Sequence, residues 1–288
     1  MKNISKTIVF LLLLSLCLIK RPSLINGIIY GINLWKTCLF PSIFPLLILS
    51  DLALSTNIIK IISESIGLIF KKIFNIPKEA AYVLFMSFFT GCPSNAKYIK
   101  DLLDNKMIDN IGAIKILSIA QLYNPNLIIT ITPFLTFKSK LFLIIGNLFC
   151  NLLIGLINRH IKCNYYKAIK KQITFSLTNS INNAINTLLN ILGVIVTFSA
   201  LSSIFKINHP LFTGIFEITN GISKINTSEI NALFMCTLML SFGGLSIIYQ
   251  IKGILKEHKL DYTLYYKSRI MHVFLFLILT LIYIRYCL

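Results

Sequence analysis

The sequence predicts an all-α, polytopic helical membrane protein, and three observations support this fold class. The 288 residues are 56% hydrophobic with a mean hydropathy of +0.77, and several apolar blocks approach the roughly 20 residues that a helix needs to cross a bilayer. Only 13% of the residues are charged. The apolar blocks lack the sustained two-residue alternation of a membrane barrel. We therefore expect residues 1–288 to form a single integral membrane domain in the cell membrane, with the lipid bilayer as a partner.

The net charge of +18 arises from 28 Lys and Arg residues against 10 Asp and Glu residues. The basic residues stand in short gaps between apolar blocks, where positive-inside anchoring and contact with anionic headgroups explain them. No nucleic-acid partner is therefore expected. The seven cysteines are widely spaced and form no CxxC pair, which indicates packing rather than disulfides or a metal site. No cofactor is predicted.

Residues 1–24 consist of an apolar run, 8–19, with basic residues on both flanks. The pattern has the outline of a signal peptide, but no small-x-small cleavage site follows it. We therefore expect an uncleaved and rather short first membrane helix, whose orientation the flanking charges do not decide.

Residues 24–54 form one long apolar stretch that Pro41 and Pro45 interrupt. Each proline removes a backbone donor, so residues 40–45 are expected to form a kink or an unwound turn within the membrane. A proline-kinked spanning helix without any ligand fits the same pattern. Asp51 indicates a helix end at an interface rather than a cation site, because a polar stretch follows it.

Residues 58–76 mix apolar residues with Lys60, Glu64, Lys71 and Lys72. This mixture fits an amphipathic helix lying on the membrane surface better than a span.

The polar run 90–109, TGCPSNAKYIKDLLDNKMID, directly follows an apolar half-helix. Its Gly91-Cys-Pro93 turn predicts a helix break, which opens onto polar side chains such as Asn95. Non-helical backbone at membrane depth is tolerated only where protein buries it or water wets it, so the break predicts a pathway or a binding site. Lys97 lies about one turn away and is placed to reach an anionic group gathered by the freed amides.

A second broken helix is predicted within residues 111–131, because Asn124 and Pro125 stand at the middle of an apolar segment. Another apolar segment, 141–157, follows. The basic loop 159–171 is expected in the cytoplasm.

The second half of the chain looks like a worn copy of the first, because one shift of 152 positions aligns both a membrane segment and a helix break. The shift sets Leu49 and Ser50 on Leu201 and Ser202, and it sets Gly91, Ser94, Ile99, Lys100, Leu103 and Asp109 on Gly243, Ser246, Ile251, Lys252, Leu255 and Asp261. Internal repeats that meet at broken helices are typical of secondary transporters. We therefore predict two repeated halves, residues 28–158 and 176–286, of undetermined relative sense.

In the second half, Gly243 and Gly244 replace the Gly-Cys-Pro turn. Glu217 and Asn220 stand in the otherwise apolar segment 212–221, where they mark either a polar path or a simple interfacial turn. A final membrane helix is expected from residue 265 onward, with Arg269 and His272 near its start.

Several of these segments, in their order, resemble the YlbJ-type family of sporulation integral membrane proteins. The similar segments are GINLWKTCLFPSIFPLLILSDL, FTGCPSNAKYIKDLLDNKMI, an Asn-Pro in the next helix, EITNG and LSFGGLS. The resemblance is closest over about residues 28–158 and weaker over about 176–282, and Gly91-x-Pro93 leading to Ala96-Lys97 is its most specific piece. Asn95 departs from the family's usual Gly, which puts a close backbone approach there in doubt.

These proteins of endospore-forming Firmicutes carry the nucleoside-recognition, or Gate, domain. The resemblance implies a role in sporulation, in building the spore cortex or coat-stage envelope, and kinship with nucleoside transporters.

Two functions from different classes fit the sequence. The first is a transporter-like or channel-like protein that moves or senses a small solute. The second is a non-transporting scaffold that recruits spore-envelope proteins, with a homo-oligomer or other sporulation membrane proteins as partners. An enzyme is not expected, because the chain has no HExxH, GxSxG or P-loop motif. The predicted ligand-binding or pathway residues are Pro41, Ser42, Pro45, Gly91, Pro93, Ser94, Asn95, Lys97, Asn124, Pro125, Glu217, Asn220, Gly243, Gly244 and Ser246.

Overall fold

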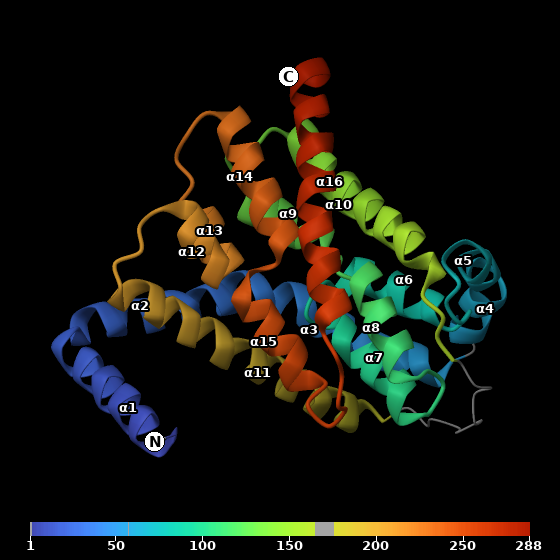
Figure 1. The fold of residues 1–288 in the computed structure, drawn as a ribbon, viewed down its shortest axis with the longest axis horizontal. Helices are drawn as coiled ribbons and strands as arrows, with labels where there is room; N and C mark the ends of the chain where they lie inside the picture. The colour runs from blue at the N-terminus through green and yellow to red at the C-terminus, as the bar shows by residue number, and fades with distance from the viewer. Residues whose placement is uncertain (1, 57, 165–175) are drawn as a thin grey trace.

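A computed structural model describes residues 2–56, 58–164 and 176–288 of the protein, and every regular element in these ranges is helical. The elements, in chain order, are α1 (Lys2–Ile19), α2 (Arg21–Leu34), the π-helical turn η1 (Trp35–Leu39), α3 (Phe40–Ser55), α4 (Ile58–Glu64), α5 (Ile66–Phe74), α6 (Ala80–Thr90), α7 (Asn95–Asp104), α8 (Asn110–Ile119), α9 (Pro125–Ile131), α10 (Phe137–Ile157), the 3-10 turn η2 (Asn158–His160), α11 (Leu177–Ile204), α12 (Pro210–Phe216), α13 (Ile218–Ser223), α14 (Glu229–Phe242), α15 (Gly244–Ile254) and α16 (Thr263–Cys287). Figure 1 shows their arrangement.

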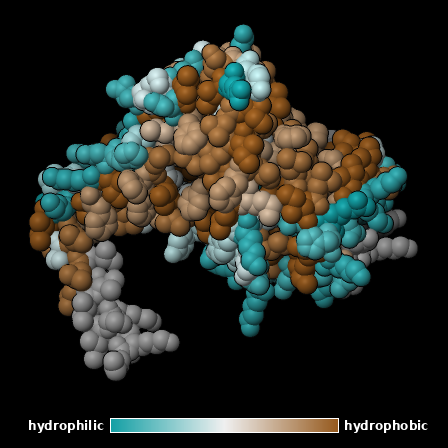
Figure 2. Space-filling view, turned by 45° about the horizontal axis from the view of Figure 1, so that its top comes forward, coloured by the Kyte–Doolittle hydropathy of each residue, from teal (hydrophilic) through white to brown (hydrophobic). Residues whose placement is uncertain are grey.

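Five helical stretches of the described chain are long and apolar enough to cross a membrane. They are Arg21–Ala53, Phe137–His160, Leu177–Ile204, Glu229–Ile254 and Thr263–Cys287. Apolar side chains cover much of the face drawn in Figure 2, and hydrophilic ones gather at its edges. The protein is therefore an all-α, multi-pass membrane protein, as the composition predicts.

The helices α2 and α11 pack side by side along their length (Figure 1). A Cβ atom added at Gly27 would lie 2.7 Å from Ala200 Cα, so the two backbones touch there. Further along α2, the Trp35 indole N–H donates to the Leu188 carbonyl at 3.0 Å. Residue numbers rise on α2 as they fall on α11, so the two helices run antiparallel.

Of the kink or unwound turn expected at residues 40–45, the unwound turn is absent, because the chain stays helical from α2 through η1 into α3. Pro41 follows the π-helical turn almost directly, and Pro45 lies further inside α3. The π-helical turn directly before them changes the hydrogen-bond register, and the Ser42 hydroxyl donates to the Cys38 carbonyl at 2.6 Å. The helix thus continues through both prolines.

Two other boundaries differ from the sequence prediction. The first helix ends at Ile19 and α2 begins at Arg21, so a turn at Lys20 divides the region predicted as one helix over residues 1–24. The predicted amphipathic helix 58–76 is two short helices, α4 and α5, separated at Ser65. The basic loop 159–171 lies partly outside the described residues, which end there at Asn164.

Both predicted breaks of the first half are present. The helix α6 ends at Thr90, Gly91 has a φ of 75°, the Cys92–Pro93 peptide is cis, and α7 begins at Asn95. The helix α8 ends before the buried coil 120–124, and Asn124 then caps the start of α9.

A third break separates α14 from α15 in the second half. Gly243 and Gly244 have φ values of 93° and 68°, which favour glycine over any other residue. Gly243 ends α14, and α15 begins at Gly244.

Replacing Gly27 by Leu tests the contact between α2 and α11. The new side chain has no room against the α11 backbone, so the variant is expected to lose about 2 kcal/mol or more of stability, seen as a lower Tm in detergent. Gly193→Ala on α11 is the control, because no atom lies within 4 Å of a Cβ built there. An unchanged Tm for Gly27→Leu would contradict the close packing.

Candidate functional site

The three helix breaks meet in the interior of the protein. We call this region the central junction and define it as residues 91–94, 120–124 and 243–244. The Cys92 N–H in the first break donates to the Leu122 carbonyl in the second at 2.8 Å. Backbone groups freed by one break are therefore satisfied by another.

Two glycines allow the backbone segments of the junction to pack against one another. A Cβ atom at Gly91 would lie 2.8 Å from the Asn124 backbone nitrogen. A Cβ atom at Gly243 would collide with the Gln121 side-chain amide and would lie 3.5 Å from the Tyr123 hydroxyl. The break of the second half thus packs directly on the second break of the first half, and protein shields the unwound backbone.

Amide side chains bind the carbonyls that the second break releases. The Asn95 amide donates to the Ala120 carbonyl at 2.9 Å, and the Asn151 amide donates to the Gln121 carbonyl at 3.0 Å. The Tyr265 hydroxyl donates to the Gln121 side-chain carbonyl. Asn95 therefore has a structural role at the junction, whatever else it binds.

Arg269 of α16 is the most unusual group beside the junction. Its side chain is 2% exposed, and its Nη2 donates to the Ser118 carbonyl at 2.7 Å and to the Asn151 side-chain oxygen at 2.9 Å. Its Nε and Nη1 have no hydrogen-bond partner, and no carboxylate is paired with it, among the described residues. A buried guanidinium without a counter-charge is costly, so an anion would bind favourably there.

Further buried polar atoms at or next to the junction also lack a hydrogen-bond partner within the described residues. They are Ser94 Oγ, Asn95 Oδ1, Gln121 Nε2, Tyr123 Oη, Asn147 Nδ2 and Ser246 Oγ. Buried polar groups in proteins are normally satisfied, so this concentration of unsatisfied groups is typical of a functional site. Both halves of the chain contribute to it.

A small cavity of about 30 Å³, the central cavity, lies beside the junction. Its polar lining comes from Tyr123 in the first half and from Glu217, Thr219, Ser246 and Gln250 in the second. The volume holds little more than one water molecule. The protein is therefore closed at this point.

A wider polar groove of about 550 Å³ lies between α7, α11 and α15. Charged and amide side chains line this groove: Lys97, Lys100, Asp101, Asp104, Asn183, Asn186, Asn190, Gln250 and Lys256. Ile191 and Gln250 line both the polar groove and the central cavity. These two side chains therefore separate the groove from the cavity.

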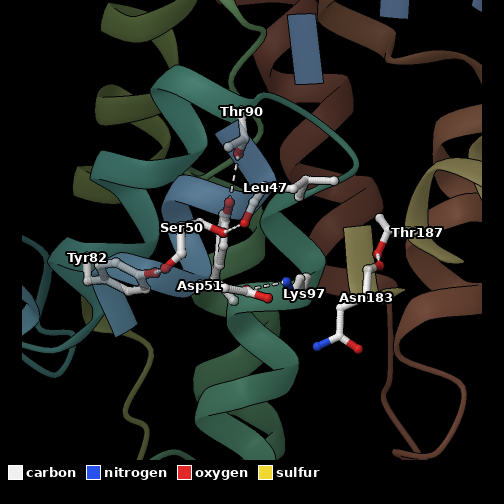
Figure 3. A network of polar contacts seen from close by, with 9 residues as sticks. Leu47, Ser50, Asp51, Tyr82, Thr90, Lys97, Asn183 and Thr187 are labelled. Atoms are coloured by element: carbon white, nitrogen blue, oxygen red, sulfur yellow. Dashed lines mark hydrogen bonds and ion pairs between the residues drawn. The ribbon is translucent and has the colours of Figure 1, made fainter. Parts of the chain in front are cut away.

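Lys97 forms an ion pair instead of pointing at the freed amides. Its Nζ lies 2.5 Å from Asp51 Oδ1, and the two side chains are 16% and 11% exposed. Figure 3 shows the pair between α7 and α3, with Asn183 and Thr187 of α11 on the other side of Lys97. Asp51 lies near the C-terminal end of α3, as expected of a residue close to a helix end, and it also fixes Lys97.

Ion pairs also hold the outer end of α7 to the loop between α15 and α16. Lys100 lies 2.7 Å from Glu257, and His258 lies 2.8 Å from Asp104. The hydrogen bond from Lys100 holds the pKa of the Glu257 carboxyl below its ordinary value. The two halves of the chain are thus bound to each other at the mouth of the polar groove.

Thirteen of the fifteen predicted site residues divide into two groups, and the other two, Lys97 and Asn220, lie in the polar groove and in α13. The residues that the structure brings to the junction or the central cavity are Gly91, Pro93, Ser94, Asn95, Asn124, Pro125, Glu217, Gly243, Gly244 and Ser246. Pro41, Ser42 and Pro45 belong to the continuous helix α3, and the structure places none of them in the lining of the cavity or groove.

Glu217 and Asn220 have a clear local role. The Glu217 carboxylate accepts hydrogen bonds from the Thr219 and Asn220 backbone N–H groups at 3.1 and 2.6 Å, which caps α13. Glu217 also lines the central cavity. The carboxylate is therefore satisfied by the helix end while it faces the cavity.

Sequence reasoning missed Gln121, Tyr123, Asn151 and Arg269 as site residues. The sequence places Arg269 near the start of the last predicted helix and assigns it no role. Its position inside an apolar stretch of 25 residues was the available signal, because an ionisable residue within a span is normally functional.

Comparison with known proteins identifies one curated relative. The chain is 23% identical to the sporulation integral membrane protein YlbJ of Bacillus subtilis (strain 168) over 296 aligned positions, which cover 84% of this chain and 72% of that protein. No family model matches the chain, and no solved structure matches it significantly.

Removing one partner of the Asp51–Lys97 pair is expected to destabilise the protein. Lys97→Met leaves a largely buried carboxylate unpaired, which costs about 3 kcal/mol. Asp51→Asn with Lys97→Met should cost less than the sum of the single changes, measured as Tm in detergent. Lys100→Met is the control, because its partner Glu257 is 60% exposed and such pairs contribute about 0.5 kcal/mol. Strictly additive losses would contradict the coupling.

Proposed function

We propose that the protein is a sporulation-associated membrane protein of transporter or channel type, which moves or senses a small solute at the central junction during formation of the spore envelope or cortex. The observation that carries the proposal is the meeting of three helix breaks beside a buried Arg269 that lacks a counter-charge. A protein that only crossed the membrane would need neither feature. The association with sporulation rests on the similarity to YlbJ.

An internal repeat supports this class of function. The helices α4 and α5 begin at positions 58 and 66, and α12 and α13 begin 152 positions later, at 210 and 218. The same shift carries Gly91 onto Gly243, and each of these glycines ends a helix with a positive φ. The agreement in helix boundaries is independent of the residue matches that suggest the repeat.

The packing favours an inverted relation between the halves. Under the same shift α11 corresponds to residues 25–52, which span most of α2, η1 and α3, and α2 and α11 run antiparallel. Inverted repeats place a solute site where the two halves meet, at broken helices. The central junction is such a meeting place, because it combines two breaks of the first half with one of the second.

The polar groove, the central cavity and the junction define a route for the solute. The groove is open to solvent, and Ile191 and Gln250 close it off from the cavity. The structure then corresponds to a closed form, in which movement of α11 relative to α15 would connect the groove to the junction.

The charge at the junction favours a solute with an anionic group. Arg269 offers two unpaired guanidinium nitrogens there, and the buried Glu217 carboxylate is occupied by the N-terminus of α13. Guanidinium groups bind carboxylates and phosphates with high geometric specificity. A neutral solute would leave the Arg269 charge uncompensated.

Uptake into proteoliposomes tests the proposal. The purified full chain is expected to accumulate at least one labelled solute from a panel of a carboxylate, inorganic phosphate and a nucleoside, with the anions preferred. Arg269→Gln and Asn95→Leu should lower the initial rate at least tenfold. Arg269→Gln should keep or raise the Tm, because it removes an uncompensated buried charge. Lys138→Gln, a substitution of a basic residue at the start of α10, should leave the rate unchanged.

A scaffold that recruits spore-envelope proteins without transport is the second candidate. The basic, amphipathic helix α5 favours it, because its lysines are exposed at the surface. Complementation of a spore-forming host that lacks the related protein separates the two functions. If Arg269→Gln and Asn95→Leu restored spore formation as fully as the unaltered chain, the transport proposal would fail and the scaffold would be favoured.

A further inference from the structure

A second depression lies away from the junction, where the end of α5 meets the end of α10. It has a volume of about 460 Å³. Its lining residues are Lys71, Lys72, Asn75, Leu156, Ile157, Arg159 and His160. We call it the basic groove, and no part of it is shared with the polar groove or the central cavity.

The charge of the basic groove has a single sign. Every ionisable side chain among its described lining residues is basic, and no aspartate or glutamate is among them. The side chains of Lys71, Lys72, Arg159 and His160 are exposed at the surface. Such a concentration of like charge is unfavourable by itself and is relieved when an anion binds.

A buried lysine binds the backbone carbonyls that would otherwise repel an anion. The C-terminal ends of α5 and η2 lie beside the basic groove, and helix C-termini carry partial negative charge. The Lys115 ammonium donates to the carbonyls of Asn75 at 2.9 Å, Arg159 at 3.4 Å and Ile161 at 2.7 Å. Lys115 therefore neutralises these carbonyls and adds a further positive charge beneath the groove.

Apolar side chains border the basic groove. Leu156 and Ile157 at the end of α10 are 45% and 42% exposed, and Leu68 and Ile69 on α5 are both 56% exposed. In a multi-pass membrane protein, exposed apolar residues next to a spanning helix face the acyl chains of lipids. The basic groove thus lies where the lipid-facing surface ends and the basic surface begins.

We propose that the basic groove binds the headgroup of an anionic phospholipid. The phosphate is held by Lys72 and Arg159, and the acyl chains lie along the exposed apolar residues of α5 and α10. Basic pockets at the ends of membrane helices recognise anionic lipid headgroups by this combination of charge and apolar contact. A free phosphate would use the charges alone and would leave the apolar border uncovered. The site is independent of transport at the junction.

Lipid titration of the purified full chain tests this site. The protein in neutral detergent is titrated with phosphatidylglycerol, or with phosphatidylcholine of the same acyl chains, while Tm and bound lipid are followed, the latter by native mass spectrometry. Phosphatidylglycerol is expected to raise Tm by several degrees and to stay bound, and phosphatidylcholine is not. Added salt should weaken the effect, because it screens the exposed charges.

Paired substitutions test whether phosphatidylglycerol binds at the basic groove. The double variant Lys72→Gln, Arg159→Gln should weaken phosphatidylglycerol binding at least tenfold with little change in the Tm of the lipid-free protein, since both side chains are exposed. Arg159→Lys should retain most of the binding, because the charge is kept. Lys138→Gln with Lys140→Gln is the matched control, because it removes two charges at the opposite end of α10.

Three results would overturn the proposal. Equal stabilisation by phosphatidylcholine would show that charge is not recognised. Equal loss of binding in the Lys138 and Lys140 control would show that only the overall charge of the protein matters. A Tm increase of the same size with inorganic phosphate would show a free-anion site instead of a lipid site.

Discussion

The structure depends on satisfying the backbone groups that are released where membrane helices stop. No water is present in the hydrocarbon core of a bilayer, so each unpaired N–H or C=O group there is expensive. The protein meets this demand by placing its breaks against one another, with the Cys92 N–H bound to the Leu122 carbonyl and the amides of Asn95 and Asn151 bound to neighbouring carbonyls. The breaks are therefore mutually dependent, which explains why three of them meet at one place.

The sequence predicts the fold class and the breaks well, because both depend on local composition. Glycine and proline act on their own backbone, so Gly91, Pro125 and Gly243 mark helix ends wherever the rest of the chain lies. Side-chain partners depend on tertiary packing, which is why the pairing of Lys97 with a carboxylate 46 positions away was not predicted. Pro41 does not end its helix, because a π-helical turn before it keeps the chain helical.

The junction combines tight packing with incomplete hydrogen bonding. Its glycines allow backbone contact without voids, and the central cavity has only about 30 Å³ of space. Polar atoms such as Gln121 Nε2 and Arg269 Nε nevertheless have no partner among the described residues. A core selected for stability alone would replace these groups by apolar ones. Their presence in a tightly packed interior supports the solute site proposed at the junction.

Under the proposed repeat, the last helix differs from its counterpart in the first half in a way that affects how a solute would be held. Under the shift of 152 positions, α16 corresponds to α8 and α9, and His272 falls on Ala120, where the first half unwinds. The unwound segment of the first half therefore offers a solute fixed peptide dipoles. The continuous helix α16 offers it the formal charge of Arg269. Dipoles act only at short range, and a full charge acts over several ångströms. A passing anion would thus be attracted by one wall of the junction and oriented by the other.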